Sequence, residues 1–465
     1  MRTDLDVVGD ALDESKLTPV HRRIFALIAA GYFIDVTDYV IFGSMIPLLL
    51  RAGFATRGEL ALVGSAQLFG LAIGTFFQGQ FSDRIGRKAT YQFNLLLFGL
   101  ATIVGALVST VLWLAVARFV AGIGLGAEQP LAFAYAGEFA PKRLRGRILS
   151  FIHFIGGALT WPLSALLALL LGPHFGWRAI WVCIGVAALL IFALRFSLPE
   201  SPRWLIAKGR DREAFGTLAR MGLTPASTGI AAPVIKQDPF SLVWRLYGRR
   251  LTAATVALSA FFCVTIGFGT WLPNIMHGKG FSITQSLTYS FGMMLAVPCA
   301  SLFMMFALDR YGRKRTAIAA FIAAGIMAVA FSRAETNAQL LVAGFAMIFC
   351  YQIGGNTMQI FTSEVFPTSA RASGFGMAAG IGRLATAGFI PLLPWIQVTF
   401  GLPTVFITVA VLLCVAAVTV NFIGPETKKR SLEDIAANEE TVPSSSFVPI
   451  ASVAFGEQSH SRKDD

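Results

Sequence analysis

The sequence predicts an all-α integral membrane protein with twelve transmembrane helices in two parallel six-helix repeats. Three observations lead to this prediction. Of the 465 residues, 55% are hydrophobic and 14% are charged, whereas a soluble domain carries about 25% charged residues. Apolar runs of about 18 to 27 residues recur along the chain, which is the length that a membrane-spanning helix needs. Separated motifs also recur at one constant offset, which indicates a duplicated unit.

The apolar runs define the predicted spans in order. They are too long and too uniformly apolar for the alternating strands of an outer-membrane barrel. The predicted spans are 24–50, 60–81, 89–108, 111–136, 148–172, 179–198, 251–276, 285–308, 316–331, 338–362, 375–398 and 403–423.

The composition excludes a soluble enzyme, a fibrous protein and a disulfide-stapled secreted module. All five cysteines fall inside apolar runs, so none is placed for a secreted-type disulfide. The formal net charge is +12, but the basic residues gather in short loops on one side of the membrane, so we expect no nucleic-acid partner. The first apolar run is too long for a signal-peptide core and lacks a small-residue cleavage site, which indicates a retained helix.

The distribution of basic residues sets the orientation. Thirty of the 38 Lys and Arg residues fall in alternate segments counted from the N-terminus, and five fall in the opposite loops. By the positive-inside rule, both termini and the middle loop face the cytoplasm. We expect an N-terminal half (1–198), a cytoplasmic middle loop (199–250), a C-terminal half (251–423) and a cytoplasmic tail (424–465). Residues 203–222 of the loop are predicted to form amphipathic surface helices.

Three motifs recur at an offset of 226 residues. Asp83-Arg84-Ile85-Gly86-Arg87-Lys88 returns as Asp309-Arg310-Tyr311-Gly312-Arg313-Lys314. Glu138, Pro141 and Arg145 return as Glu364, Pro367 and Arg371, and Pro199-Glu200 returns as Pro425-Glu426. Because six helices per half is an even number, both halves enter from the same side, as parallel repeats do. This is the architecture of an alternating-access carrier, with its substrate site between the halves at mid-depth.

On these motifs the chain resembles the major facilitator superfamily. The segment 83–88 matches the superfamily's loop motif. Glu138-Phe139-Ala140-Pro141 and Pro199-Glu200-Ser201-Pro202-Arg203 resemble its sugar-porter and organic-ion branch. The paired glutamines typical of sugar porters are missing from Phe261-Phe262-Cys263-Val264-Thr265-Ile266-Gly267.

Other motifs resemble carriers of acids and metabolites. Asp35-x-x-Asp38 in the first span and Gly382-Arg383 in the eleventh resemble the aromatic-acid/proton symporters and the niacin-type metabolite carriers. Gly126-Ala127-Glu128-Gln129-Pro130 in the fourth span is similar to the niacin-type and organic-ion carriers.

The repeat offers an internal control, because structural residues should appear in both halves while site residues need not. Five charges within spans lack a charged counterpart 226 residues away: Asp35, Asp38, Arg118, Glu128 and Arg383. A charge at mid-bilayer costs at least ~2.5–3.5 kcal/mol on insertion scales, so it is rarely without a role.

Asp35 and Asp38 are the candidate proton carriers. They lie three residues apart on the first span, where neighbouring carboxylates repel and burial disfavours the charged form. Arg118 is the expected ion partner, and protonation would release it and bias the carrier between two states. We take Asp38 as the main carrier, with the two aspartates exchanging roles otherwise. The alternative is a fixed ion pair that locks the first span to the fourth.

Glu128 and Arg383 are the other two unmatched charges. Glu128 lies about 15 Å deeper than Arg118 at helical rise and is a candidate proton relay or substrate contact; alternatively it caps a helix or pairs with a basic group. Arg383 is suited to bidentate capture of a substrate carboxylate. The alternative for Arg383 is an internal ion pair, with Asp35 as one candidate.

Uncharged polar and aromatic residues complete the predicted substrate site. Gln352, Asn356 and Gln359 form one polar stripe on the tenth span, which either lines the cavity or bonds to neighbouring helices. His153 is the one histidine within a predicted span, and Tyr32 and Trp161 are candidates for stacking on a planar ligand. Helix packing is the alternative for all three. Gly70/Gly74, Gly122/Gly126 and Gly376/Gly380 are small-xxx-small pairs that permit close helix contact.

The recurring loop motifs predict gating rather than recognition, with the setting of topology as the alternative. The predicted gating residues are Asp83, Arg84, Gly86, Arg87, Glu138, Arg145, Asp309, Arg310, Gly312, Arg313, Glu364 and Arg371. Glu138, Arg145, Glu364 and Arg371 are expected to close ion pairs across the cytoplasmic face.

The sequence thus predicts a secondary active transporter, a proton-coupled symporter of a small organic acid, aromatic or nicotinate-like. The alternatives are a sugar or polyol symporter and an exporter of small organic compounds. We expect no enzyme activity, cofactor or metal, because no Walker A loop or HExxH pair appears. The expected partners are the substrate, protons and the lipid bilayer, with a monomeric chain in a bacterial inner membrane.

Overall fold

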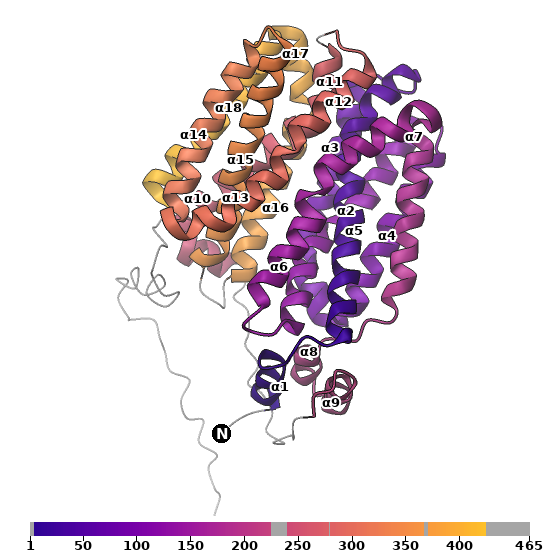
Figure 1. Cartoon of the computed structure of the whole chain (residues 1–465), viewed down its shortest axis with the longest axis vertical. Helices are drawn as coiled ribbons and strands as arrows, with labels where there is room; N and C mark the ends of the chain where they lie inside the picture. Colours follow the sequence, from indigo (N-terminus) through magenta and orange to yellow (C-terminus); the bar gives the residue numbers. More distant parts are fainter. Residues whose placement is uncertain (1–3, 225–239, 279, 367–370, 425–465) are drawn as a thin grey trace, which may run out of the picture.

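The computed structural model describes residues 4–224, 240–278, 280–366 and 371–424. Every regular element in these segments is a helix, which confirms the predicted all-α class. Two bundles stand side by side, one built from each half of the chain (Figure 1).

The first bundle contains six crossings. Four are single helices: α2 (Pro19–Arg51), α3 (Arg57–Ile85), α4 (Arg87–Leu107) and α5 (Val111–Phe139). The other two share one run of α6 (Arg145–His153), the π-helix η1 (Phe154–Ala158) and α7 (Thr160–Arg195). This run has 51 residues, which at ~1.5 Å each is more than twice the ~30 Å core of a bilayer. Gly176, with φ of 71°, breaks it, so the run crosses twice.

The second bundle has more interrupted helices. Its seventh span joins α10 (Phe240–Phe262), the π-helix η2 (Cys263–Phe268) and α11 (Gly269–Gly278), and its eighth joins α12 (Ile283–Met294) to α13 (Ala296–Tyr311). The ninth and tenth are α14 (Arg313–Ser332) and α15 (Asn337–Val365). The eleventh is α16 (Arg371–Phe389) bent by 41° into α17 (Leu392–Phe400), and the twelfth is α18 (Leu402–Ile423).

The number of crossings agrees with the prediction. Within the described segments ten helical runs are long and apolar enough to span a membrane, or eleven with the bent pair. Counting the run that Gly176 breaks as two gives twelve. The chain is therefore a multi-pass membrane protein with the twelve-helix major facilitator fold.

Local contacts at the motif glycines repeat between the halves. Gly86 and Gly312 precede α4 and α14 with φ of 104° and 84°, a backbone conformation that favours glycine. Lys88 then donates to the carbonyl of Phe196 at 2.9 Å, and Lys314 donates to the carbonyl of Gly424 at 2.8 Å. Each lysine thus ties the start of its bundle's third span to the end of the sixth.

Helices α3 and α5 pack with their backbones in contact. A Cβ on Gly70 would lie 2.1 Å from the carbonyl oxygen of Phe119, and one on Gly122 would lie 2.1 Å from that of Gln67. Gly74 and Gly126 make equally close approaches, so these two predicted small-residue pairs are confirmed. In the third pair only Gly380 is close, against the ring of Phe76 on α3, and Gly376 faces open space.

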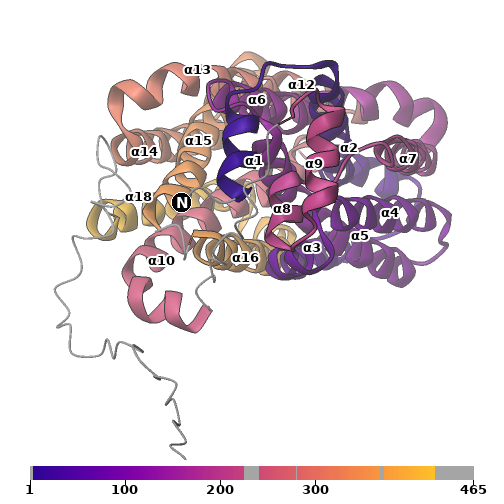
Figure 2. The same ribbon diagram turned by 90° about the horizontal axis from the view of Figure 1, so that it is seen from below.

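Three short helices lie across one end of the first bundle (Figures 1 and 2): α1 (Asp4–Asp13), α8 (Pro202–Ala207) and α9 (Asp211–Arg220). The last two confirm the predicted surface helices of the middle loop. Helix α1 was not predicted; it packs on α8 and buries Val8 and Leu12. At the opposite end of the molecule, α11 contacts α2 and α12 contacts α7, which joins the two bundles there.

Candidate functional site

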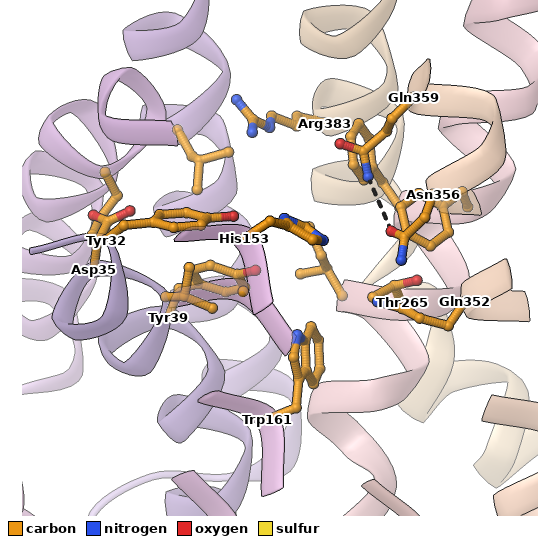
Figure 3. A pocket seen from close by; sticks show the side chains of 17 residues that line it. Tyr32, Asp35, Tyr39, His153, Trp161, Thr265, Gln352, Asn356, Gln359 and Arg383 are labelled. Carbon is orange, nitrogen blue, oxygen red and sulfur yellow. Dashed lines mark hydrogen bonds between the residues drawn. The ribbon is translucent and has the colours of Figure 1, made fainter. Parts of the chain in front are cut away.

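A narrow pocket lies between the two bundles at mid-span. The centres of water-sized spheres reach about 60 Å³ of it. Figure 3 shows Asp35 and two tyrosines on the side of the first bundle, facing amides on the side of the second. The polar and aromatic side chains that line the pocket are Tyr32, Asp35, Tyr39, His153, Trp161, Phe261, Phe262, Thr265, Gln352, Asn356, Gln359 and Arg383.

Both π-helices border this pocket. Segment η1 begins directly after His153, and η2 contains Thr265 and Ile266. A π-turn adds one residue to the helical repeat and is frequent at functional sites. Gly156 lets the first span approach here, since a Cβ on it would lie 2.3 Å from the Tyr32 ring.

Arg383 projects from α16 of the second bundle and reaches the first. Its guanidinium donates to the Thr75 hydroxyl on α3 and, at 3.4 Å, to the carbonyl of Gly126 on α5. The guanidinium carbon also lies 5.6 Å from the centre of the Phe262 ring. Arg383 is therefore a buried cation that lines the pocket and links its two sides.

Asp35 faces the same pocket from α2. Its side chain is 2% exposed, and its Oδ1 atom has no hydrogen-bond partner among the described residues. No direct ion pair joins Asp35 to any residue that the structure describes. The internal ion pair of Arg383 with Asp35, one of the sequence alternatives, is thus not formed in this conformation.

Asp38 lies away from the pocket in a closed network. Arg118 donates to Asp38 at 3.0 Å, and both side chains are fully buried. Thr102 donates to the other carboxylate oxygen of Asp38 at 2.9 Å and accepts from Arg118 at 2.6 Å. The Trp181 ring covers the guanidinium at 4.8 Å. The expected Asp38–Arg118 pair is present, and its geometry favours a fixed lock between spans.

Glu128 pairs with a residue that sequence analysis did not select. Arg195 of α7 donates to Glu128 at 2.8 Å, with both side chains fully buried, and stacks 3.7 Å from the centre of the Tyr91 ring. This geometry matches the alternative in which Glu128 binds a basic group. The repeat control held the signal: Arg195 lies within a predicted span, and its counterpart position is Asn421.

The predicted polar stripe lines the pocket. Gln359 donates to Asn356 at 3.5 Å, while Oε1 of Gln352 is buried without a described partner. His153, Tyr32 and Trp161 also line it as predicted. Four lining residues were missed: Tyr39, Thr265, Phe261 and Phe262. Tyr39 follows Asp35 by one helical turn, so periodicity would have found it. The other three lie in or beside η2, where the repeat of an α-helix does not hold.

The described gating residues form ion pairs within the first half. Arg87 binds Glu138 at 3.2 Å, and Arg145 binds Asp13 of α1 at 2.6 Å. Glu200 accepts the backbone N–H of Arg87 at 3.0 Å. Burial raises the pKa of the Glu200 carboxyl above its ordinary value, against the opposing effect of its backbone N–H donors.

The remaining gating predictions are placed as follows. Arg84 is exposed, and Arg313 is partly buried behind Gly312. Five predicted gating side chains lie outside the part that the structure describes: Asp83, Asp309, Arg310, Glu364 and Arg371. The described residues contain no group of three or more His, Cys, Asp or Glu side chains placed to hold a metal ion.

Comparison with known proteins places this pocket in context. The profile of the family "Sugar (and other) transporter" matches residues 38–438. The niacin transporter NiaP of Acinetobacter baylyi is 28% identical over 424 residues, covering 89% of this chain and 96% of that protein. The 4-hydroxybenzoate transporter PcaK of the same organism is 29% identical over 370 residues, covering 76% and 79%.

A solved structure supports the fold. The xylose transporter XylE from E. coli, in a partially occluded inward-open conformation, aligns with a TM-score of 0.74 at 18% identity. The alignment covers 89% of this chain and 100% of that chain.

Proposed function

Because the chain belongs to the sugar (and other) transporter family of the major facilitator superfamily, we propose that it is a proton-coupled symporter of a small organic acid. The family and the similar proteins are transporters rather than enzymes. The finer assignment of substrate and coupling is argued below from the pocket.

One observation carries the proposal: Asp35 and Arg383 line the same pocket from opposite bundles (Figure 3). A guanidinium offers paired N–H donors that match the two oxygens of a carboxylate. A carboxylate beside it can take up a proton. The pocket therefore holds one group for an organic anion and one for a proton.

Charge balance links the two ligands. The empty pocket carries one negative and one positive side chain, so its net charge is zero. A bound carboxylate alone makes the pocket negative, and a bound proton alone makes it positive. When both bind, the charge returns to zero.

Enclosing a net charge in a medium of low dielectric is costly, since the charge loses its hydration. The empty and the doubly loaded carriers are therefore the forms that reorient most readily. This rule couples one proton to each monocarboxylate. The Asp38–Arg118 and Glu128–Arg195 pairs are each neutral and do not alter the balance.

The rest of the pocket favours a planar substrate with polar substituents. Tyr39 and Trp161 meet edge to face at 6.3 Å, and Tyr32 lies nearby. Gln352, Asn356 and Gln359 offer amide donors and acceptors for a ring nitrogen or hydroxyl. The printed substrates of the two similar proteins, niacin and 4-hydroxybenzoate, support an aromatic or nicotinate-like acid.

The alternative is a neutral sugar or polyol. The three amides favour it, because amides also bind hydroxyl groups. In that case Arg383 would serve to hold the bundles together through Thr75 and Gly126.

Uptake by purified protein in liposomes tests the proposal. Labelled nicotinate, 4-hydroxybenzoate and xylose are supplied outside under an imposed inward proton gradient. Protein-free liposomes give the passive entry of each acid. We expect protein-dependent accumulation of an acid that a protonophore abolishes. Accumulation of xylose but of neither acid would contradict the organic-acid assignment.

Three further expectations stay proposals. The membrane is a bacterial inner membrane, both termini face the cytoplasm, and the chain works as a monomer. The motif residues around Arg87 and Arg145 act as the gate on the side of the termini.

A further inference from the structure

A second cavity lies outside the transport site, between the first turns of α2 and α6. The centres of water-sized spheres reach about 520 Å³ of it, and it shares no lining residue with the central pocket. Eight of its ten lining residues are apolar, among them Phe25, Ile148 and Phe151. The other two are Arg22 and Arg147, one from each helix.

The two arginines stand together at one end of an apolar groove. Arg22 is in the first turn of α2, and Arg147 is in the first turn of α6. Both are exposed, and no hydrogen bond or ion pair joins either of them to another residue in the described segments. The groove lining contains no carboxylate. The groove therefore has a positive mouth whose charge is not neutralised by its own wall.

The apolar wall continues from the arginines toward the middle of the membrane. From Arg22 to Ala29 the helix rises by about 10 Å, and both residues line the groove. Phe151 is 62% exposed although it lies on this wall. Such an exposed phenylalanine among apolar neighbours is unfavourable in water and favourable against hydrocarbon.

We propose that this groove binds an anionic phospholipid, with the headgroup phosphate between Arg22 and Arg147 and an acyl chain along Phe25, Ile148 and Phe151. Guanidinium groups bind phosphate through paired hydrogen bonds, and basic pockets between membrane helices suit anionic headgroups. An amphiphile fits both parts of the groove, whereas a soluble anion would leave the apolar wall uncovered.

The position of the groove connects it to the gate. Leu144 and Arg147, both in the lining, flank Arg145, which binds Asp13 of α1. Leu17 of the lining lies in the segment that joins α1 to α2. A lipid in the groove thus braces the first turns of α2 and α6 next to the ion pair that holds α1.

Thermal unfolding of the purified full-length chain in detergent tests this proposal without measuring transport. The probes are phosphatidylglycerol, phosphatidylcholine and inorganic phosphate, each titrated separately. Phosphatidylglycerol should raise the apparent melting temperature more than phosphatidylcholine, and phosphate alone should have little effect. Equal effects of both lipids, or a full effect of phosphate alone, would overturn the proposal.

Two variants and a matched control locate the site. Arg22→Gln with Arg147→Gln should lose most of the phosphatidylglycerol shift, with roughly tenfold weaker binding for each arginine removed. Arg23→Gln with Arg143→Gln removes the same charge from two exposed arginines that do not line the groove, and should keep the shift. Ala26→Trp keeps both arginines but fills the apolar part, and should also lose it. If the control pair loses the shift as much as the groove pair, the effect is general surface charge and the site is wrong.

Discussion

Asp35 and Asp38 lie three residues apart on α2, yet only Asp35 faces the transport pocket. Asp38 is instead fixed by Arg118 and Thr102, with its side chain fully buried. A carboxylate that releases and takes up protons needs access to the pocket, and one held by a guanidinium resists protonation. The structure therefore favours Asp35 over Asp38 as the proton carrier, which reverses the order expected from sequence.

Asp35→Asn should abolish accumulation driven by a proton gradient while leaving substrate exchange. The amide resembles the protonated acid, so the loaded carrier still reorients but no proton is released inside. Uptake under a pH gradient, compared with counterflow at equal pH, separates the two activities. Asp35→Glu is the matched control and should retain part of the coupled uptake. Wild-type accumulation by Asp35→Asn would exclude this role.

Asp38→Asn should mainly destabilise the protein. It leaves the buried Arg118 without its charged partner, and breaking a buried pair costs about 3–5 kcal/mol. Thermal unfolding in detergent should show a lower melting temperature, and Arg118→Met added to Asp38→Asn should recover part of the loss. A stable Asp38→Asn protein that loses proton coupling alone would restore Asp38 as the carrier.

Arg383→Gln should weaken binding of the acid by about 2–5 kcal/mol, or about 30-fold to several thousandfold. Arg383→Lys keeps the charge but loses the paired donors, so its affinity should fall between the two. Calorimetric binding of the acid transported best by the wild type measures both. Unchanged affinity in Arg383→Gln would show that this residue holds the bundles together rather than the substrate.

Glu128 and Arg195 should act as one unit in stability. Glu128→Gln and Arg195→Gln each leave a buried charge, so each is expected to lower the melting temperature, and the double variant should lose less than the sum. A double-mutant cycle should give a coupling of about 1–3 kcal/mol. Additive losses would mean that the 2.8 Å contact contributes little.

Asp13→Ala should change the rate of transport more than the affinity for substrate. Asp13 accepts from Arg145 at 2.6 Å and from Arg203 at 2.7 Å, so it joins α1 to the gate and to α8. These pairs are partly exposed, and each contributes only about 0–1 kcal/mol to stability. Initial rates and substrate affinity in liposomes measure the two effects. Glu14→Ala, at an exposed neighbour, is the control.

The sequence predicted the number and order of spans because apolar length is a property of each segment alone. It also predicted Arg383, Gln352 and Asn356 as pocket residues, because polar groups within an apolar helix need a polar surrounding. It did not predict α1, whose apolar residues Val8 and Leu12 gain a partner only when α8 folds beneath them. It could not separate Asp35 from Asp38, because their difference depends on which neighbouring helix supplies Thr102 and Arg118.

The two buried ion pairs have a mechanical consequence. Asp38–Arg118 and Glu128–Arg195 both lie within the first bundle, where α3 and α5 also touch backbone to backbone. The matching positions in the second bundle are Val264, Gly344, Gly354 and Asn421, and its spans are interrupted at η2, after Met294 and after Phe389. After the duplication, the two copies have therefore taken on different stiffness. We expect the first bundle to behave as an anvil that keeps its shape through the transport cycle. The second should supply most of the bending, and spin labels placed within it should report larger changes in internal distance than labels within the first.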